Sequence, residues 1–281
     1  MHLPLSRRAS DELGVTLIWR DASASTNGEL VSQAALADLT VMATDTQTAG
    51  RGRLDRAWST PPGTALAVSA FLAHEPSGAD PAAMPDSRRL GWVPLLAGVA
   101  MVRAVRGLGV GAAGLKWPND VLVDGRKLCG ILTELTPTGV VVGAGLNVSM
   151  TAQQRPVPTA TSLVIEGLPE HGEPVHGEAS TLLDRALAAY LRELVPLVGR
   201  RREAEHPADL RPLVEQHLQT LGLAVRVDLP GQPPLRGVAV GLDDDGRLLV
   251  RSGGDDSGVT SGATSGVVAV AAGDVTHLRY E

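Results

Sequence analysis

The chain has 281 residues, of which 43% are hydrophobic and 20% charged, and its formal net charge is -6. This length suits about two domains with a sizeable core, and the negative charge excludes a basic nucleic-acid binder on bulk electrostatics. The single cysteine, Cys129, excludes a disulfide framework and a thiolate zinc cluster, which fits a reducing cytoplasm. Only two basic residues are lysines, Lys116 and Lys127, and they lie in one short segment.

The sequence contains neither a secretory signal nor an apolar run long enough to span a membrane. Residues 1–11 lack the apolar stretch of a secretory signal, and the longest apolar run, residues 90–102, is shorter than the ~20 residues that span a bilayer. We therefore expect a cytoplasmic protein that makes no membrane contact.

Hydrophobic spacing and turn residues predict an α/β domain over residues 1–221 followed by an all-β module over residues 222–281. Ser25, Thr26 or Asn27 is the expected N-cap of the first helix. The expected helices are 27–37, 89–106, 179–203 and 207–221, and the expected strands are 15–19, 40–45, 64–72, 114–117, a hairpin over 121–135, and 139–148. The expected loops are 47–63, 74–88, 153–176 and 252–266.

The first candidate site is an arginine-rich loop that reads Gly-Arg-Gly-Arg-Leu-Asp-Arg-Ala-Trp over residues 50–58. Glycines permit close backbone approach, and arginines offer forked donors that match phosphate or carboxylate oxygens. This pattern predicts an anion-binding loop, with Trp58 placed to cover a ligand ring. A merely solvated, charged loop is the alternative.

The second candidate site is the hairpin that follows the sequence Lys-Trp-Pro-Asn-Asp at residues 116–120. Asp124-Gly125 between alternating apolar residues predicts a type I′ turn, which places Leu122 opposite Lys127 and Asp120 opposite Cys129. Asp120 and Lys127 then become diagonal neighbours about 7 Å apart along the backbone. A plain surface ion pair is the alternative, but the scarcity of lysine favours a functional point charge.

A third segment, Gly-Ala-Gly-Leu-Asn at residues 143–147, begins like a dinucleotide-binding fingerprint. Val148 stands where the third glycine belongs and no helix follows, so we reject that interpretation. The glycines instead predict close approach of a ligand to the strand, with Asn147 as a hydrogen-bonding group. The histidines show no metal-ligand spacing, and the Asp-Asp-Asp-Gly sequence at 243–246 predicts a turn rather than a calcium loop.

Taken together, the Ser-Thr-Asn at 25–27, the loop over 47–58, the two lysine segments and the glycines at 143–147 resemble biotin protein ligases in kind, order and spacing. The resemblance implies an α+β fold similar to class II aminoacyl-tRNA synthetases, with a mixed sheet backed by helices and a small C-terminal SH3-like β-barrel. It also implies a ligase reaction in which biotin and Mg²⁺-ATP give biotinyl-5′-AMP. The biotinyl group then passes to one lysine of the carboxyl carrier domain of an acetyl- or propionyl-CoA carboxylase.

The resemblance assigns roles to individual residues, with no protein-held metal. Because the reaction joins two anions, cationic donors must stabilise the transition state, and we expect Lys127 and Arg53 to do so, with Asp120 orienting the acceptor lysine. The implied biotin-binding residues are Ser25, Thr26, Asn27, Gln47, Arg51, Gly52, Arg53 and Lys127. The implied ATP-binding residues are Arg51, Arg53, Trp58, Lys116, Asn119 and Asn147. The expected close-approach glycines are Gly50, Gly130, Gly143 and Gly145.

Two departures from the family pattern bear on the prediction. Asp55 replaces the third glycine of the family's arginine loop, and a neighbouring arginine is its expected partner when the site is empty. Only about twenty residues precede the core, so we expect no DNA-binding repressor domain, and we expect a monomer or a weak homodimer.

A lipoate or octanoate ligase is the competing enzyme, but its Arg-Arg-x-x-Gly-Gly motif is absent. A biotin sensor without catalysis is the competing non-enzyme.

Overall fold

A seven-stranded mixed sheet forms the centre of the computed structural model, which describes residues 1–53, 56–74, 90–171, 180–229, 233–252, 266–271 and 273–277. In spatial order the strands are β1 (Thr16–Trp19), β2 (Thr40–Thr44), β5 (Ala65–Ala73), β9 (Gly139–Asn147), β8 (Arg126–Thr136), β7 (Asp120–Val123) and β6 (Ala113–Lys116). Only β1 and β2 run parallel. The expected strands and the mixed, largely antiparallel sheet are confirmed.

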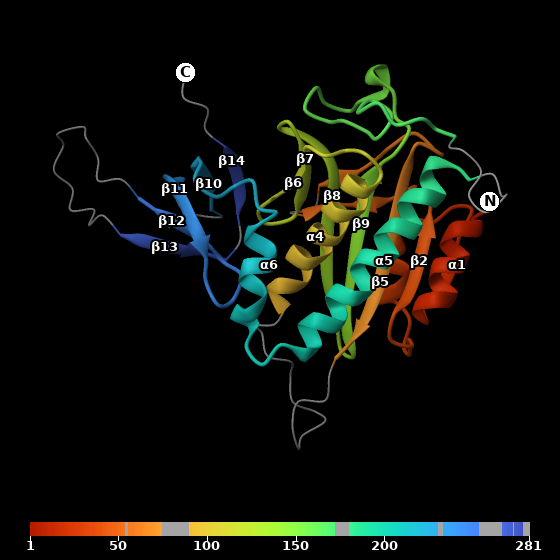
Figure 1. Ribbon diagram of the computed structural model, residues 1–281, viewed down its shortest axis with the longest axis horizontal. Coiled ribbons are helices and arrows are strands. Elements are labelled where there is room, and N and C mark those ends of the chain that lie inside the picture. The colour runs from red at the N-terminus through yellow and green to blue at the C-terminus, as the bar shows by residue number, and fades with distance from the viewer. Residues whose placement is uncertain are drawn as a thin grey trace.

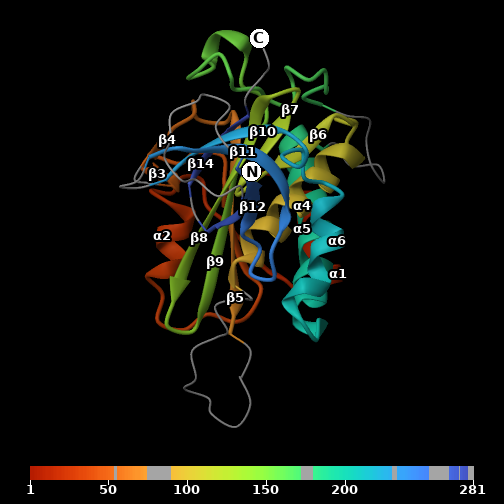
Figure 2. The same ribbon diagram turned by 90° about the vertical axis from the view of Figure 1, so that its left-hand side faces the viewer.

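Helices cover the two faces of this sheet unequally, as Figures 1 and 2 show. One face carries α1 (Pro4–Leu13), α4 (Trp92–Gly107), α5 (Leu182–Glu203) and α6 (Arg211–Glu215). The other face carries α2 (Thr26–Val31), which buries Leu30 against Met42, Phe71 and Val141. Because α2 covers only part of its face, the rest of that face is left for the hairpin of β3 (Gly50–Arg51) and β4 (Ala57–Trp58).

Helix α4 is buried along most of its length because small and branched apolar side chains face both the sheet and α5. It begins at Trp92, three residues after the expected start, and Arg89 lies outside the described residues. Helix α5 begins at Leu182 with Thr181 as its N-cap, and Ala179 also lies outside the described residues. Among the described helices, none is long and apolar enough to cross a membrane.

Two expected helices are shorter than predicted. The helix expected over 27–37 ends at Val31, where the side chains of Ser32 and Gln33 both donate to the Glu29 carbonyl. The helix expected over 207–221 is a 3-10 turn, Pro207–Leu210, followed by α6. Beyond α6 the chain extends and Leu218 pairs with Leu115 at the edge of the sheet, so a backbone pairing replaced the last helical turn.

Helix α1 was not expected, because the residues that it buries, Ser6, Ala9 and Ser10, are small or polar rather than large and apolar. Its N-terminus lacks a cap of its own, and the buried carboxylate of Asp184 accepts hydrogen bonds from the N–H groups of Leu5 and Ser6 at 3.0 and 2.9 Å. Asp184 also lies in the first turn of α5, so one carboxylate serves the N-terminal ends of two helices.

The C-terminal part is an antiparallel sheet of five strands, as in an SH3-like domain. Its order is β13 (Val267–Val270), β12 (Leu248–Arg251), β11 (Leu235–Leu242), β10 (Ala224–Asp228) and β14 (Asp274–His277). Among the described strands, β13 and β14 are not paired, so the sheet is open there. Residues 54–55, 75–88, 172–176 and 253–265 of the expected loops lie outside the described residues, so the expected arginine partner of Asp55 stays a prediction.

The turn at 243–246, predicted from its sequence, fastens this module to the larger sheet. The indole N–H of Trp92 donates to the Asp244 carbonyl at 3.0 Å, and that of Trp117 donates to the Gly246 carbonyl at 3.0 Å. A Cβ on Gly91 would lie 2.2 Å from the Asp245 carbonyl oxygen. The start of α4 and the turn are therefore in direct backbone contact, and the module is held against the seven-stranded sheet and its helices.

Candidate active site

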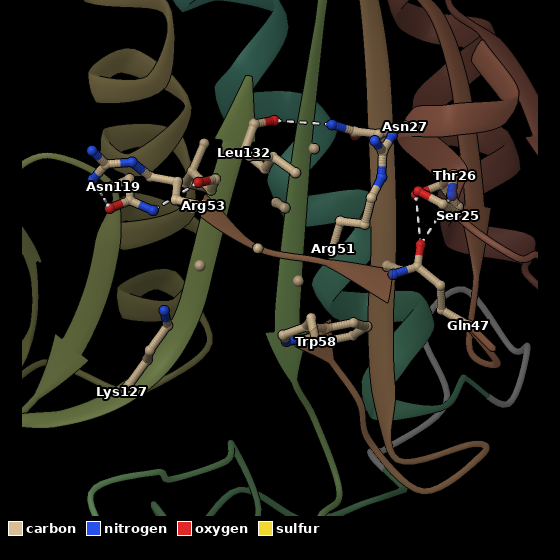
Figure 3. A pocket seen from close by; sticks show the side chains of 17 residues that line it. Ser25, Thr26, Asn27, Gln47, Arg51, Arg53, Trp58, Asn119, Lys127 and Leu132 are labelled. Atoms are coloured by element: carbon tan, nitrogen blue, oxygen red, sulfur yellow. Dashed lines mark hydrogen bonds between the residues drawn. The ribbon is translucent and has the colours of Figure 1, made fainter. Parts of the chain in front are cut away.

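A cavity lies on the sheet face that α2 leaves uncovered, between α2, the β3–β4 hairpin and strands β8 and β9 (Figure 3). Its lining comes from segments far apart in the sequence: Ser25, Thr26, Asn27, Gln47, Arg51, Gly52, Arg53, Trp58, Ala67, Asn119, Lys127, Gly130, Ile131, Leu132, Gly143, Ala144 and Gly145. Most of the residues predicted for the site therefore meet in one place.

One end of the cavity is built from neutral polar groups. Of the three expected N-cap candidates, Ser25 is the N-cap of α2, and its hydroxyl accepts from the Gly28 N–H at 3.2 Å. The side-chain oxygen of Gln47 accepts from the backbone N–H of Thr26 at 2.9 Å and lies 3.2 Å from the Thr26 hydroxyl. Each group is thus oriented before any ligand arrives.

The glycines allow side chains of the site to lie directly on backbone. A Cβ on Gly143 would be 2.1 Å from the Asn27 side-chain oxygen, and a Cβ on Gly145 would be 2.8 Å from the Trp58 indole. At Gly50 a Cβ would lie 2.4 Å from the Trp58 carbonyl oxygen. At these positions the groups that lie against the backbone are Asn27 and Trp58, and the close approach of a ligand stays a prediction. A Cβ on Gly130 would lie 3.1 Å from the end of the Lys127 side chain, which is a milder constraint because that end can move.

The other end of the cavity holds charged groups. The ammonium of Lys127 lies 2.6 Å from a carboxylate oxygen of Asp120, so the predicted side-chain contact is confirmed. Nearby, Arg53 donates to the side-chain oxygen of Asn119 at 3.1 Å, and the Asn119 amide donates to the Ile131 carbonyl at 2.8 Å. Both cations therefore reach the same end of the cavity, Lys127 from β8 and Arg53 from the segment that follows β3.

The predicted hairpin register is right near the turn and wrong beyond it. Asp124 and Gly125 have φ values of 48° and 79°, as a type I′ turn requires, and Leu122 faces Lys127. Asp120, however, faces Gly130 rather than Cys129, because Leu128 is an extra residue that forms a β-bulge. The bulge lets both Leu128 and Cys129 enter the core while Lys127 and Gly130 face the cavity.

The backbone of Lys127 is clamped by a segment of the expected 153–176 loop. Its N–H donates to the Thr159 carbonyl at 2.7 Å, and its carbonyl accepts from the Thr161 N–H at 2.9 Å. Asn147 donates its amide to the Thr161 carbonyl at 2.8 Å. Asn147 therefore supports residues 159–161, the strap that holds the backbone of Lys127. Asn147 itself is not among the residues that line the cavity.

Arg51 and Lys116 do not join the two cations at the charged end. Arg51 turns away from Arg53, and its guanidinium pairs with Glu134 at 2.9 Å. Lys116 lies on β6, outside the cavity lining, near His277. Burial of His277 and, to a smaller extent, the Lys116 charge lower the pKa of this histidine to about 4. The sequence grouped these cations with Arg53 because loop spacing does not reveal which way each side chain turns.

Burial determines the state of the thiol beside this site. It raises the pKa of Cys129 well above its usual value, although the nearby Lys127 charge acts in the opposite direction. The thiol therefore stays protonated and does not serve as a nucleophile.

A second cavity of about 200 Å³ adjoins the first and shares Arg53, Asn119, Ile131 and Leu132 with it. Its far wall comes from the C-terminal module, through Asp245, Gly246, Arg247 and Ala271. A weak contact of 3.5 Å joins Arg53 to the Gly273 carbonyl of the module. The module is thus part of the surroundings of Arg53.

Three polar residues around the site were missed by sequence reasoning. Ser69 interrupts the apolar strand β5 and bonds Thr26 and Asn27 at 2.7 and 2.6 Å. Glu134 contacts Asn27 and Arg51, and Glu166 pairs with Arg126 at 3.0 Å beside the strap. A polar residue inside an apolar strand was the available signal for Ser69, while the other two depend on long-range contacts.

Comparisons with known proteins agree with this geometry. Residues 19–150 match the Biotin/lipoate A/B protein ligase family, and residues 220–278 match the Biotin protein ligase C terminal domain. The chain is 35% identical to the Biotin--[acetyl-CoA-carboxylase] ligase of Mycobacterium tuberculosis, over 98% of this chain and 97% of that protein. It belongs to the biotin protein ligase family.

More distant relatives of this family show the same pattern. The Bifunctional ligase/repressor BirA of Escherichia coli is 32% identical over 74% of this chain and 60% of its own length. A solved biotin protein ligase from Aquifex aeolicus, in complex with biotin and ATP, superposes with a TM-score of 0.70. That match covers 94% of this chain and 99% of the other at 24% identity, which shows a shared fold.

Proposed function

We propose that this chain is an ATP-dependent biotin protein ligase that forms biotinyl-5′-AMP and passes the biotinyl group to a carrier lysine. The observation that carries the proposal is one cavity with a neutral hydrogen-bonding end and a cationic end. Biotin has the matching form, with a polar ureido ring at one end and a carboxylate at the other.

In the first step the biotin carboxylate attacks the α-phosphorus of ATP, and pyrophosphate leaves. Ser25, Thr26 and Gln47, preoriented at the neutral end, receive the ureido group. The carboxylate then points toward Lys127 and Arg53, whose charges stabilise the negative charge that builds up between the two anions. Gly52, Asn27 and Arg51 complete the biotin side of the cavity.

ATP enters as its Mg²⁺ complex and is a substrate rather than a resident cofactor. Among the described residues no three His, Cys, Asp or Glu side chains gather to hold a metal, so phosphate oxygens and water supply most magnesium ligands. Asn119 and Arg53 contact the nucleotide, and Trp58 lies on the adenine side. Lys116 and Asn147 lie outside the cavity lining, and Asn147 acts on the site through residues 159–161, which hold the backbone of Lys127.

In the second step the acceptor lysine amine attacks the acyl carbon of the adenylate, and AMP leaves. Asp120 is the group that orients this amine and accepts its proton, because its carboxylate lies at the cationic end beside Lys127. The cavity walls exclude water from the mixed anhydride, which protects it from hydrolysis.

The acceptor is a biotin carboxyl carrier domain, in keeping with relatives named biotin--[acetyl-CoA-carboxylase] ligase. We propose that the chain acts in the cytoplasm as a monomer or a weak homodimer without binding DNA. We also propose a domain boundary at residues 221 and 222, where the chain enters β10.

The test is intact-mass spectrometry of an apo carrier domain incubated with the protein and Mg²⁺-ATP. Parallel reactions contain biotin, lipoate or octanoate. A mass gain with biotin alone, lost when the carrier lysine is replaced, is the expected result. Gain with lipoate or octanoate would indicate a lipoate-type ligase, and tight biotin binding without adenylate formation would indicate a sensor.

A further inference from the structure

Glu134 occupies a position that links three separate elements at the neutral end of the cavity. It lies on β8, opposite Val141 of β9, and its side chain is 23% exposed. One carboxylate oxygen accepts from the Asn27 amide of α2 at 2.9 Å. The Arg51 guanidinium of β3 lies 2.9 and 3.2 Å from the two oxygens.

The first consequence concerns the orientation of the Asn27 amide. Its nitrogen donates both to Glu134 and to the Leu132 carbonyl, at 2.9 and 3.2 Å, so its donors are used. Its oxygen accepts from the Ser69 hydroxyl at 2.6 Å. The opposite orientation would set the amide oxygen against two other acceptors, so Glu134 and Leu132 fix this side chain in one pose.

The second consequence concerns the wall formed by β3. Arg51 and the adjacent Gly52 line one side of the cavity, and the charge of Arg51 is neutralised by Glu134. Arg53, two residues later, instead points toward Asn119. The pair between Arg51 and Glu134 therefore ties the β3 backbone to β8 without using the cation that faces the reacting groups.

We propose that Glu134 is a positioning residue for biotin, acting through Arg51 and Asn27. This inference rests on the proposed function. Glu134 holds the wall and the amide of the neutral end in place before biotin binds, which lowers the conformational cost of binding. It lies away from the Lys127 end and leaves the chemical step unchanged.

The experiment compares the whole protein with its Glu134→Ala and Glu134→Gln variants. Biotin affinity is measured by calorimetry without ATP, and adenylation by pyrophosphate exchange. For Glu134→Ala we expect the Kd and KM for biotin to rise about tenfold, with kcat and the KM for ATP within twofold of wild type. Glu134→Gln keeps the shape and one acceptor, so an intermediate loss is expected.

A double-mutant cycle with Arg51→Ala tests whether Glu134 acts through its partner. The loss caused by Glu134→Ala should shrink when Arg51 is already absent. Asp38→Asn is the matched control, because Asp38 forms a 2.6 Å ion pair with Arg202 away from the cavity, and it should leave both biotin constants unchanged.

Two results would overturn the inference. Biotin affinity unchanged in Glu134→Ala would make Glu134 an ordinary ion-pair partner, and a fall in kcat at unchanged affinity would place it in the chemistry. Thermal unfolding of each variant identifies misfolding, and the isosteric Glu134→Gln variant keeps the test valid if the alanine variant unfolds. Failure of the wild-type chain to bind biotin would instead overturn the proposed function.

Discussion

The two ends of the cavity are built on different principles. At the neutral end, hydroxyls and amides bond one another in a connected set that includes Gln47, Thr26, Ser69 and Asn27, and the charge of Arg51 beside this set is balanced by Glu134. At the other end, Lys127 and Asp120 form an ion pair, and Arg53 bonds a neutral amide oxygen. Neutral networks are rigid when every member is satisfied, whereas charges keep long-range influence over a reaction that creates charge.

This difference suggests a division of labour between the ends. Substitutions at the neutral end should change biotin affinity, because they disturb a preformed arrangement. Substitutions at the charged end should change the rates of the two chemical steps. Residues outside both ends should alter only folding stability.

The largest expected effect is at Lys127. Lys127→Ala removes a cation that strengthens its contacts as charge builds in the transition state, so pyrophosphate exchange should fall about 1000-fold. Because the Lys127 side chain is 45% exposed, the fold should be unaffected, which circular dichroism and thermal unfolding would verify. Pyrophosphate exchange at the wild-type rate in this variant would show that Lys127 does not stabilise the transition state.

Gly143→Ala should give the next largest effect, on biotin affinity. The new Cβ would lie 2.1 Å from the Asn27 oxygen, so Asn27 must leave its position, and we expect the biotin Kd to rise ~30-fold. Gly199→Ala is the matched control, since nothing lies within 4 Å of its Cβ on α5. A Gly143→Ala variant with wild-type affinity in calorimetry would contradict the preformed neutral end.

Asp120→Ala should separate the two chemical steps. Single-turnover transfer from preformed biotinyl-5′-AMP to the carrier should slow about 10- to 100-fold, because the acceptor amine loses its proton acceptor. Biotin affinity should stay near wild type. If intact-mass time courses show transfer at the wild-type rate, Asp120 has no role in the second step.

The smallest effect is expected away from both ends, at the ion pair of Asp38 with Arg202. Burial raises the pKa of the Asp38 carboxyl, but the Arg202 bonds and the Ala73 N–H outweigh it, so the pKa is lowered. The stabilisation is therefore present above the unfolded-state pKa of about 4 and is lost as pH falls through the lower folded value.

For Asp38→Asn we expect the free energy of unfolding to fall by about 1 kcal/mol at pH 7, a modest loss because the pair is partly exposed. Urea titrations should show this deficit shrinking toward pH 2, with biotin kinetics unchanged at pH 7. A deficit that is the same at both pH values would exclude the charged pair as its cause.

Local patterns in the sequence predicted several elements well. The apolar run at 90–102 predicted α4, shorter apolar runs predicted the central strands, and Asp124-Gly125 predicted the tight turn. The Ser25 cap was found because an N-cap needs only its own helix. Helix α1 was missed because its cap, Asp184, comes from 178 residues further along the chain.

By itself, the sequence determined which segments make the cavity and the family to which the chain belongs. Motif residues and their spacing can be recognised without knowing which residues lie near them in space. Only the tertiary structure decided how each side chain turns. The bulge at Leu128 placed Gly130 opposite Asp120, and Glu134 drew Arg51 away from Arg53. Both outcomes follow from core burial and long-range pairing, whose energies depend on segments that meet only when the chain is folded.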